Sequence, residues 1–211
     1  MGPELGREFY HLWNECAWLH MNWQEYVILF GTKDSRLELL NSAAGAFFRI
    51  VHDTLWEATL LHLCRLTDPP RSGGKENLTL QRLPSLAAEK IRPSVQQHLD
   101  VVLEKCEFAR DWRKRHIAHR DLQLAISENA IPLAPASRLT VRHAIEAIAD
   151  MMNAVEEHYR KSTVAHGIIP PAHHADALPY VLRDGLAMEQ RRQQLLEAGA
   201  WNHPDANPPA V

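Results

Sequence analysis

The sequence predicts an all-α fold: an antiparallel bundle of four to five helices, followed by a Pro-rich C-terminal extension that carries one further helix. Apolar residues recur at steps of three and four along most of the first 160 residues, which is the period of amphipathic helices. No alternating run is long enough to predict a strand. Pro and Gly gather mainly between the periodic segments, so turns separate the helices.

The first helix is expected from Phe9 to Phe30, with Gly31 as its C-terminal stop. Ser35 and Glu38 are spaced as a capping box, and they begin a second helix that is expected to run to about residue 66. Its apolar face is predicted to be continuous and to contain Leu40, Ala44, Phe47, Val51, Leu55, Ala58 and Leu61. Residues 68–75 are rich in Pro and Gly and form a turn, and a short helix could follow around 80–91.

Three more helices complete the prediction. Pro93 fits the first position of a helix whose apolar series reaches Ala109, and Arg113 is the next member of that series. Another helix begins near Ser137 or Thr140, with an apolar stripe made of Val141, Ile145, Ile148, Met152, Val155 and Tyr159. The last helix is expected from about 178 to 198, before a polar, Pro-rich end. We expect residues 1–165 to form the bundle and residues 166–211 the extension.

The composition is that of a folded globular protein, with 45% hydrophobic and 23% charged residues. The formal net charge of −3 gives no general basis for binding nucleic acid or a membrane, so any basic site must be local. The three cysteines form no CxxC pair, which argues against a disulfide framework and a zinc knuckle. Neither a signal peptide nor a membrane-spanning run is recognisable, so we expect a cytoplasmic protein without a membrane partner.

A local concentration of positive charge occurs in residues 110–121. The charged residues there are Arg110, Arg113, Lys114, Arg115 and Arg120 against Asp111 and Asp121, which leaves an excess of three positive charges. At about 100° per residue, Arg113 falls on the buried stripe of its helix. A buried guanidinium must be paired, so Arg113 should face a carboxylate, another subunit or a bound phosphate. His119 follows just beyond the expected helix end and can turn back toward Arg113.

The run Trp-Arg-Lys-Arg-His-Ile-Ala-His-Arg-Asp, residues 112–121, resembles the signature of the HEPN superfamily, in which Arg and His are separated by four to six residues. Here Arg113 and His119 enclose five residues. The resemblance extends to Leu12-Trp13, Trp23, Leu29-Phe30-Gly31 and Arg65-Leu66-Thr67-Asp68. Together these segments are similar to the AbiU-type branch of bacterial abortive-infection proteins over about residues 9–160.

The resemblance implies a metal-independent endoribonuclease of a phage-defence or toxin–antitoxin type system, with no cofactor and no metal. It implies RNA as the substrate, a homodimer whose Arg/His motifs line a shared cleft, and an antitoxin as a possible partner. His119 would be the general acid or base, and Arg113 would hold the phosphate oxygens. The expected products carry a 2′,3′-cyclic phosphate and a 5′-hydroxyl. The alternative is a HEPN-like module that binds RNA or a protein without cutting.

Four neighbouring residues are candidates for supporting roles. Arg110 adds positive charge. Lys114 stands where the family often has a small polar residue, and it either contacts phosphate or is only solvated. Asp121 stands where another family variant has Tyr, and it either orients His119 or is a surface carboxylate beside Arg120. His116 either joins the cleft or is solvated.

Rival signals for metal or phosphate binding are weaker. Gly73-Gly74-Lys75 lacks the rest of a phosphate-loop motif and is interpreted as a turn. Glu8 and His11 form a single Glu-x-x-His, whereas a di-metal bundle requires two such pairs. The histidines of the C-terminal extension, His166, His173, His174 and His203, are expected to be solvated.

Overall fold

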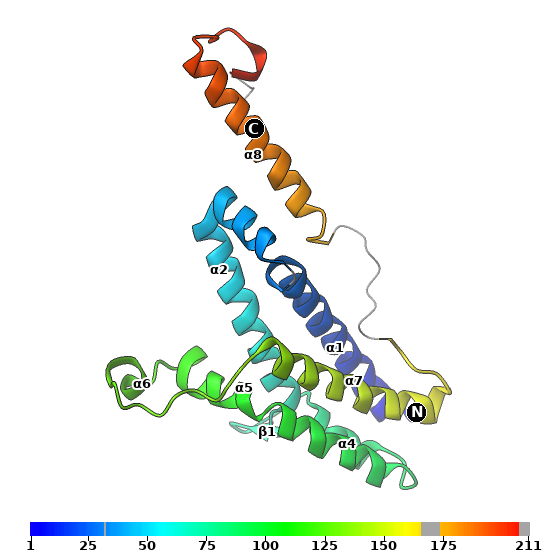
Figure 1. Ribbon diagram of the computed structural model, residues 1–211. Helices are drawn as coiled ribbons and strands as arrows, with labels where there is room; N and C mark the ends of the chain where they lie inside the picture. The colour runs from blue at the N-terminus through cyan, green and yellow to red at the C-terminus, as the bar shows by residue number, and fades with distance from the viewer. Residues whose placement is uncertain (32, 166–173, 207–211) are drawn as a thin grey trace. The chain divides into compact units, whose positions relative to one another are not determined.

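The computed structural model describes residues 1–31, 33–165 and 174–206, and it confirms the all-α class (Figure 1). Strands in this part of the chain are limited to one hairpin of two residues on each side. The long helices are α1 (Pro3–Phe30), α2 (Asp34–Thr67), α4 (Arg92–Lys105), α7 (Arg138–Arg160) and α8 (Leu178–Glu197). The short elements are β1 (Arg71–Ser72), β2 (Lys75–Glu76), η1 (Leu80–Arg82), α3 (Leu83–Leu86), α5 (Glu107–Trp112), the π-helix η2 (Arg113–Ile117), α6 (Leu122–Ile126) and η3 (Pro204–Ala206).

The chain forms two compact units, and α1 and α2 each contribute to both of them. The first unit contains Met1–Gln24 and Thr54–Ile169, and the second contains Glu25–Asp53 and Pro170–Val211. The division into 1–165 and 166–211 that the sequence suggested stays a prediction. None of the helices in the described segments combines the length and the apolar character that a membrane span requires.

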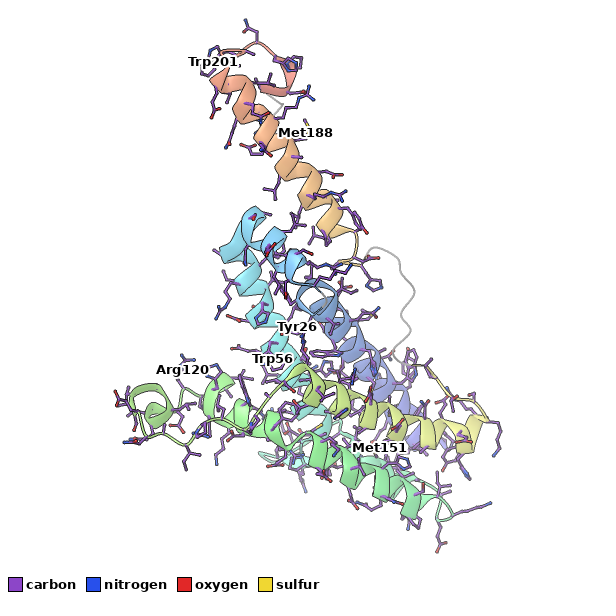
Figure 2. All side chains as sticks on the ribbon, in the orientation of Figure 1. Tyr26, Trp56, Arg120, Met151, Met188 and Trp201 are labelled. Atoms are coloured by element: carbon purple, nitrogen blue, oxygen red, sulfur yellow. The ribbon has the colours of Figure 1, made fainter. Side chains whose placement is uncertain are left out.

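The core of the first unit contains the predicted faces of α4 and α7, which lie side by side (Figure 1). Five members of the α7 stripe are buried: Val141, Ile145, Ile148, Met152 and Val155. The helix begins with a capping box between Ser137 and Thr140, in which each side chain bonds the backbone of the other residue. Met151, labelled in Figure 2, is fully buried on the same helix. Periodicity and capping therefore predicted this helix correctly.

The predicted continuous face of α2 is wrong, because the helix kinks. Ala44 has non-helical backbone angles, φ −163° and ψ 65°, and it is followed by Gly45. Glycine is common at helix kinks because it favours the helical conformation weakly. Beyond the kink the buried face is displaced: Phe47 is 59% exposed, whereas Phe48 is buried. An apolar series continued across Ala44 therefore assigns residues to the wrong face.

The turn after α2 is confirmed, and it closes a hairpin that the sequence did not predict. Gly73 and Gly74 both have positive φ, 56° and 78°, as the tightest hairpin turns require. Arg71 pairs with Glu76 and Ser72 with Lys75 in antiparallel register. Strands of two residues are too short to show an alternating pattern in the sequence.

The second unit has its own apolar cluster, built on Leu29, Leu40 and Phe48. Leu178 and Leu182 of α8 pack against this cluster. Just before α8, the Glu25 carboxylate contacts the His174 ring and accepts a hydrogen bond of 2.9 Å from the Ala175 N–H. The expectation that His174 is solvated is therefore wrong, because Glu25 holds it. His166 and His173 lie outside the described residues, and His203 is half-buried, with its Nδ1 3.8 Å from Asp205 Oδ2.

Candidate functional site

The motif segment is held in a helix that changes its winding. Cys106, with φ −96° and ψ −1°, ends α4, and α5 begins at Glu107. At Arg113 the helix continues as the π-helix η2, where the Ala118 N–H donates to the Arg113 carbonyl at 2.9 Å. The sequence predicted a regular helix through Arg113. Single π-turns inside helices occur frequently at functional sites, because they expose backbone and side chains that a regular helix would not present.

One face of this segment lines a pocket of about 490 Å³ in the first unit. Its walls are Asp68, Pro69, Gln81, Arg110, Arg113, Lys114, Ala118 and His119. The two predicted catalytic residues, Arg113 and His119, thus border the same cavity. Three cationic side chains against one carboxylate leave an excess of two positive charges in the wall, without counting histidine. A cavity of this sign suits an anionic ligand.

Arg113 is paired with Asp68 at the edge of the pocket. Its Nη1 donates to Oδ1 at 2.6 Å and to Oδ2 at 2.8 Å. The side chain of Arg113 is 41% exposed, so its predicted place on the buried stripe is wrong. Ala109, the member of the apolar series before Arg113, is fully buried, so the buried stripe ends at Ala109. Of the three partners considered from the sequence, the structure provides the carboxylate.

The electrostatics keep Arg113 positively charged. Partial burial by itself lowers the pKa of the guanidinium, but the hydrogen bond and negative charge of Asp68 outweigh it and raise that pKa above its ordinary value. Behind Arg113 lies Cys64, a buried thiol whose pKa is raised to about 11, chiefly by burial. Such a thiol stays protonated at neutral pH, so it does not add negative charge beneath the pocket.

The carbonyl end of α2 organises the floor of the pocket. The Thr67 carbonyl accepts hydrogen bonds from Arg110 Nη2 and Gln81 Nε2, both at 2.8 Å. The Thr79 hydroxyl contacts the Leu66 carbonyl at 3.0 Å and the Asp68 carbonyl at 2.8 Å. The last carbonyls of a helix have no partner within it, and cationic side chains are favoured there. These bonds fix the backbone that carries Asp68, and through it the position of Arg113.

A family model described as HEPN_AbiU2 (AbiU2) matches residues 2–178. The chain belongs to this family. The match contains Asp68 and the whole segment from Arg110 to His119, and it ends where α8 begins. The chain is therefore an abortive-infection protein of the HEPN type, as the sequence resemblance indicated. No curated protein and no solved structure matches it.

The two cations beside the HEPN motif differ in how firmly they are held. Arg110 is bonded to Thr67 and pairs with Glu107 at 3.0 Å. Lys114 is exposed and borders the pocket, so it can reach a ligand there. His119 is exposed at the same pocket.

Among the described residues, no group of three or more His, Cys, Asp or Glu side chains is arranged to hold a metal ion.

His116 lies on another face of the segment and does not border the pocket. Its ring packs edge-on against Trp112 with 5.5 Å between ring centroids, and its Nε2 is 4.0 Å from Glu57 Oε1. Its Nδ1 is 3.3 Å from Nη1 of Arg120, the residue labelled beside this segment in Figure 2. His116 is thus half-buried against an aromatic ring. Its supporting role stays a prediction.

Asp121 caps α6. Its Oδ1 accepts a hydrogen bond from the Leu124 N–H at 3.1 Å, and its Oδ2 is 3.4 Å from Arg115 Nε. The backbone hydrogen bond from Leu124 and the bond from Arg115 lower the pKa of this carboxyl. The contacts of Asp121 are thus directed to α6 and Arg115, and neither of the two roles weighed from the sequence describes them.

The sequence analysis did not identify two residues that line the pocket, Asp68 and Gln81. Asp68 lies 45 positions before Arg113, so no local spacing connects them. A signal did exist, because an arginine in a helix interface requires a carboxylate and Asp68 ends the Arg-Leu-Thr-Asp segment. For Gln81 we find no sequence signal.

Proposed function

We propose that this HEPN protein is a metal-independent endoribonuclease of a phage-defence or toxin–antitoxin type system, with its active site at the pocket of Arg113 and His119. The observation that carries the proposal is that the family's two motif residues border one cationic cavity. An imidazole and a guanidinium on one cavity are the two groups that RNA cleavage without a metal requires.

The chemistry assigns a task to each group. Cleavage by the 2′-hydroxyl requires removal of its proton, stabilisation of the pentavalent phosphorane, and protonation of the departing 5′-oxygen. His119 would transfer a proton as general base or acid. Arg113 would donate hydrogen bonds to the non-bridging phosphate oxygens, which gain negative charge in the transition state. The products would be a 2′,3′-cyclic phosphate and a 5′-hydroxyl.

Asp68 would position Arg113 for this task. Both of its contacts end on Nη1, whereas a guanidinium carries five N–H donors. The remaining donors can therefore bind a phosphate while Asp68 holds the side chain in place. The negative charge of Asp68 opposes an anionic ligand, and Arg110 and Lys114 compensate for it in the same wall.

A homodimer is part of this proposal. One pocket provides a single His119, whereas the reaction uses both a base and an acid. A second copy that faces the first would supply another Arg/His pair to the same RNA. An antitoxin that restrains the nuclease would be a further partner.

The test is RNA cleavage in the presence of EDTA. Purified protein is incubated with total RNA or transfer RNA, beside His119→Ala and a control, His143→Ala, which changes an exposed histidine on α7 outside this pocket. We expect the wild type and the control to cut RNA and His119→Ala to lose most of the activity, by about 10²–10⁴-fold. Cleavage that requires a divalent metal, or that His119→Ala retains, would contradict the proposal.

The second candidate function is a HEPN-like module that binds RNA or a protein without cutting. The Asp68–Arg113 pair favours it, because an arginine that is already neutralised can serve packing alone. Intact RNA together with a shift in gel mobility would support this alternative.

A further inference from the structure

The hairpin of β1 and β2, residues 71–76, begins directly beside the pocket. Asp68 and Pro69 line the pocket, and β1 starts two residues later, at Arg71. The hairpin and the motif segment belong to the same compact unit. A strand that leaves the pocket over the wall formed by Asp68 and Pro69 therefore meets the hairpin.

Two cations of the hairpin are not neutralised by the protein. Arg71 and Lys75 are exposed, and within the described part of the chain neither takes part in an ion pair or a side-chain hydrogen bond. Glu76 is the one carboxylate of the hairpin, and it lies opposite Arg71 in the ladder. Its Oε2 is directed to Arg82, 3.8 Å from Nη1, so both cations stay available for an anionic ligand.

The backbone of the hairpin is held in place. The Asn77 N–H donates to the Pro70 carbonyl at 2.8 Å, and Asn77 Nδ2 donates to the Pro69 carbonyl at 2.7 Å. At the tip, Gly73 and Gly74 have no side chain, and no atom of another described segment lies within 4 Å of the place where a Cβ would stand. The hairpin thus presents its two cations on an ordered and unobstructed support.

An endoribonuclease cuts within a strand, so its substrate carries phosphates on both sides of the scissile bond. A pocket of about 490 Å³ has the size of a site for one small molecule, so the neighbouring phosphates lie outside it. Proteins hold such phosphates with Lys and Arg side chains, in contacts that position the strand without reading its sequence.

We infer that the hairpin binds the phosphate backbone of an RNA strand next to the nucleotide in the pocket, with Arg71 and Lys75 as the contacting groups. The inference rests on the proposed function, which places RNA at the pocket. Gly73-Gly74-Lys75 lacks the rest of a phosphate-loop motif, and no helix begins at Lys75. The segment therefore suits the spaced phosphates of a strand better than the phosphates of a single bound nucleotide.

The test measures RNA binding, with His119→Ala in every protein to prevent cutting. Arg71→Gln and Lys75→Gln, alone and together, remove the charges of the hairpin. The matched controls Arg7→Gln and Lys90→Gln remove the same charges from exposed side chains that do not line the pocket. Lys90 precedes α4, whose 14 residues extend for about 21 Å and separate it from the motif segment. The probes are an RNA strand of about ten nucleotides and adenosine 3′-monophosphate.

We expect the double variant to raise the Kd for the strand about fivefold at low salt. It should also reduce the slope of log Kd against log salt concentration by about 1.4, because each phosphate contact to a single strand accounts for about 0.7. The Kd for adenosine 3′-monophosphate should not change, because the pocket is intact. The controls should leave both values unchanged.

Hairpin variants that bind the strand like the controls would overturn the inference, and Arg71 and Lys75 would then be solvated charges at a turn. An equal loss of affinity for the mononucleotide would also overturn it, as would a parent protein that does not bind the strand. The outcome does not depend on cleavage. Strand binding that requires the hairpin, in a protein that never cuts RNA, would uphold the inference while the proposed function fails.

Discussion

Arg113 and Arg115 belong to the same π-turn, yet their surroundings differ. Arg113 is 41% exposed, borders the pocket and pairs with one carboxylate, Asp68. Arg115 is 19% exposed and bonds the backbone carbonyls of Ile131 and Pro132, with Asp111 and Asp121 at 3.5 Å and 3.4 Å. The residue type alone therefore does not show which arginine can bind a ligand. That ability depends on N–H donors that are not already bonded and on access to a cavity.

The largest expected effect is on Arg113. Arg113→Ala should lower kcat/KM for RNA by about 10²–10³-fold, since it removes the donors to the phosphorane oxygens. Arg113→Lys should not restore activity, because an ammonium cannot reproduce the planar fork. The free energy of unfolding should fall by less than about 1 kcal/mol, because the pair with Asp68 is partly solvated. An Arg113→Ala variant that cleaves RNA as fast as the wild type would contradict a role for Arg113 that Arg115 lacks.

Arg115 should show the reverse pattern. Arg115→Ala leaves the carbonyls of Ile131 and Pro132 without their charged donor, so it should lower the free energy of unfolding by about 2 kcal/mol. Urea denaturation measures this change. Activity should fall less than in Arg113→Ala, because Arg115 does not line the pocket. An unchanged unfolding midpoint would show that Arg115 does not anchor the segment that contains Ile131 and Pro132.

Substitutions of Asp68 separate the effect of its negative charge from its role as the acceptor that positions Arg113. Asp68→Asn keeps an oxygen acceptor for Arg113 but removes the negative charge, so RNA should bind more tightly, by at most about fivefold. Asp68→Ala removes the acceptor as well, and cleavage should fall about tenfold because Arg113 is no longer positioned. Binding of RNA to an inactive His119→Ala background, with and without each change, separates the two effects. Equal behaviour of Asn and Ala would reject a positioning role.

The smallest effect concerns a buried histidine, which contrasts with the exposed His119. Burial lowers the pKa of His20 below its ordinary value, and the ring bonds the Cys16 carbonyl at 2.8 Å. As pH falls below about 6.5, the unfolded chain takes up a proton that the folded protein refuses, so stability decreases with falling pH. One such group contributes at most about 1.4 kcal/mol per pH unit. His20→Asn should flatten the loss of stability between pH 6.5 and 5.5 in urea titrations, and an unchanged slope would contradict this.

The helices were predictable where packing follows local periodicity. Ser137 and the α7 stripe were assigned correctly because capping and apolar spacing act within a few residues. The face of α2 was assigned wrongly beyond Ala44, since a single kink displaces every later residue of the series. The π-turn at Arg113 had no sequence signal.

The site was predictable only in its local part. Arg113 and His119 came from the spacing of one segment, and the structure brings both to one pocket. A carboxylate partner for Arg113 was one of the predicted options, but the choice of Asp68 was not predicted, because the two residues are separated by 45 positions of sequence. The anchoring role of Arg115 was equally inaccessible, since its acceptors are backbone carbonyls, which every residue possesses.

The most direct test of the nuclease mechanism uses a short RNA and the same strand with 2′-deoxyribose at every position, both incubated with the protein in EDTA. The account predicts that the RNA is cut to fragments that end in a 2′,3′-cyclic phosphate, that the deoxy strand stays intact, and that His119→Ala cuts neither. Cleavage of the deoxy strand, or fragments that end in a 3′-hydroxyl, would contradict it.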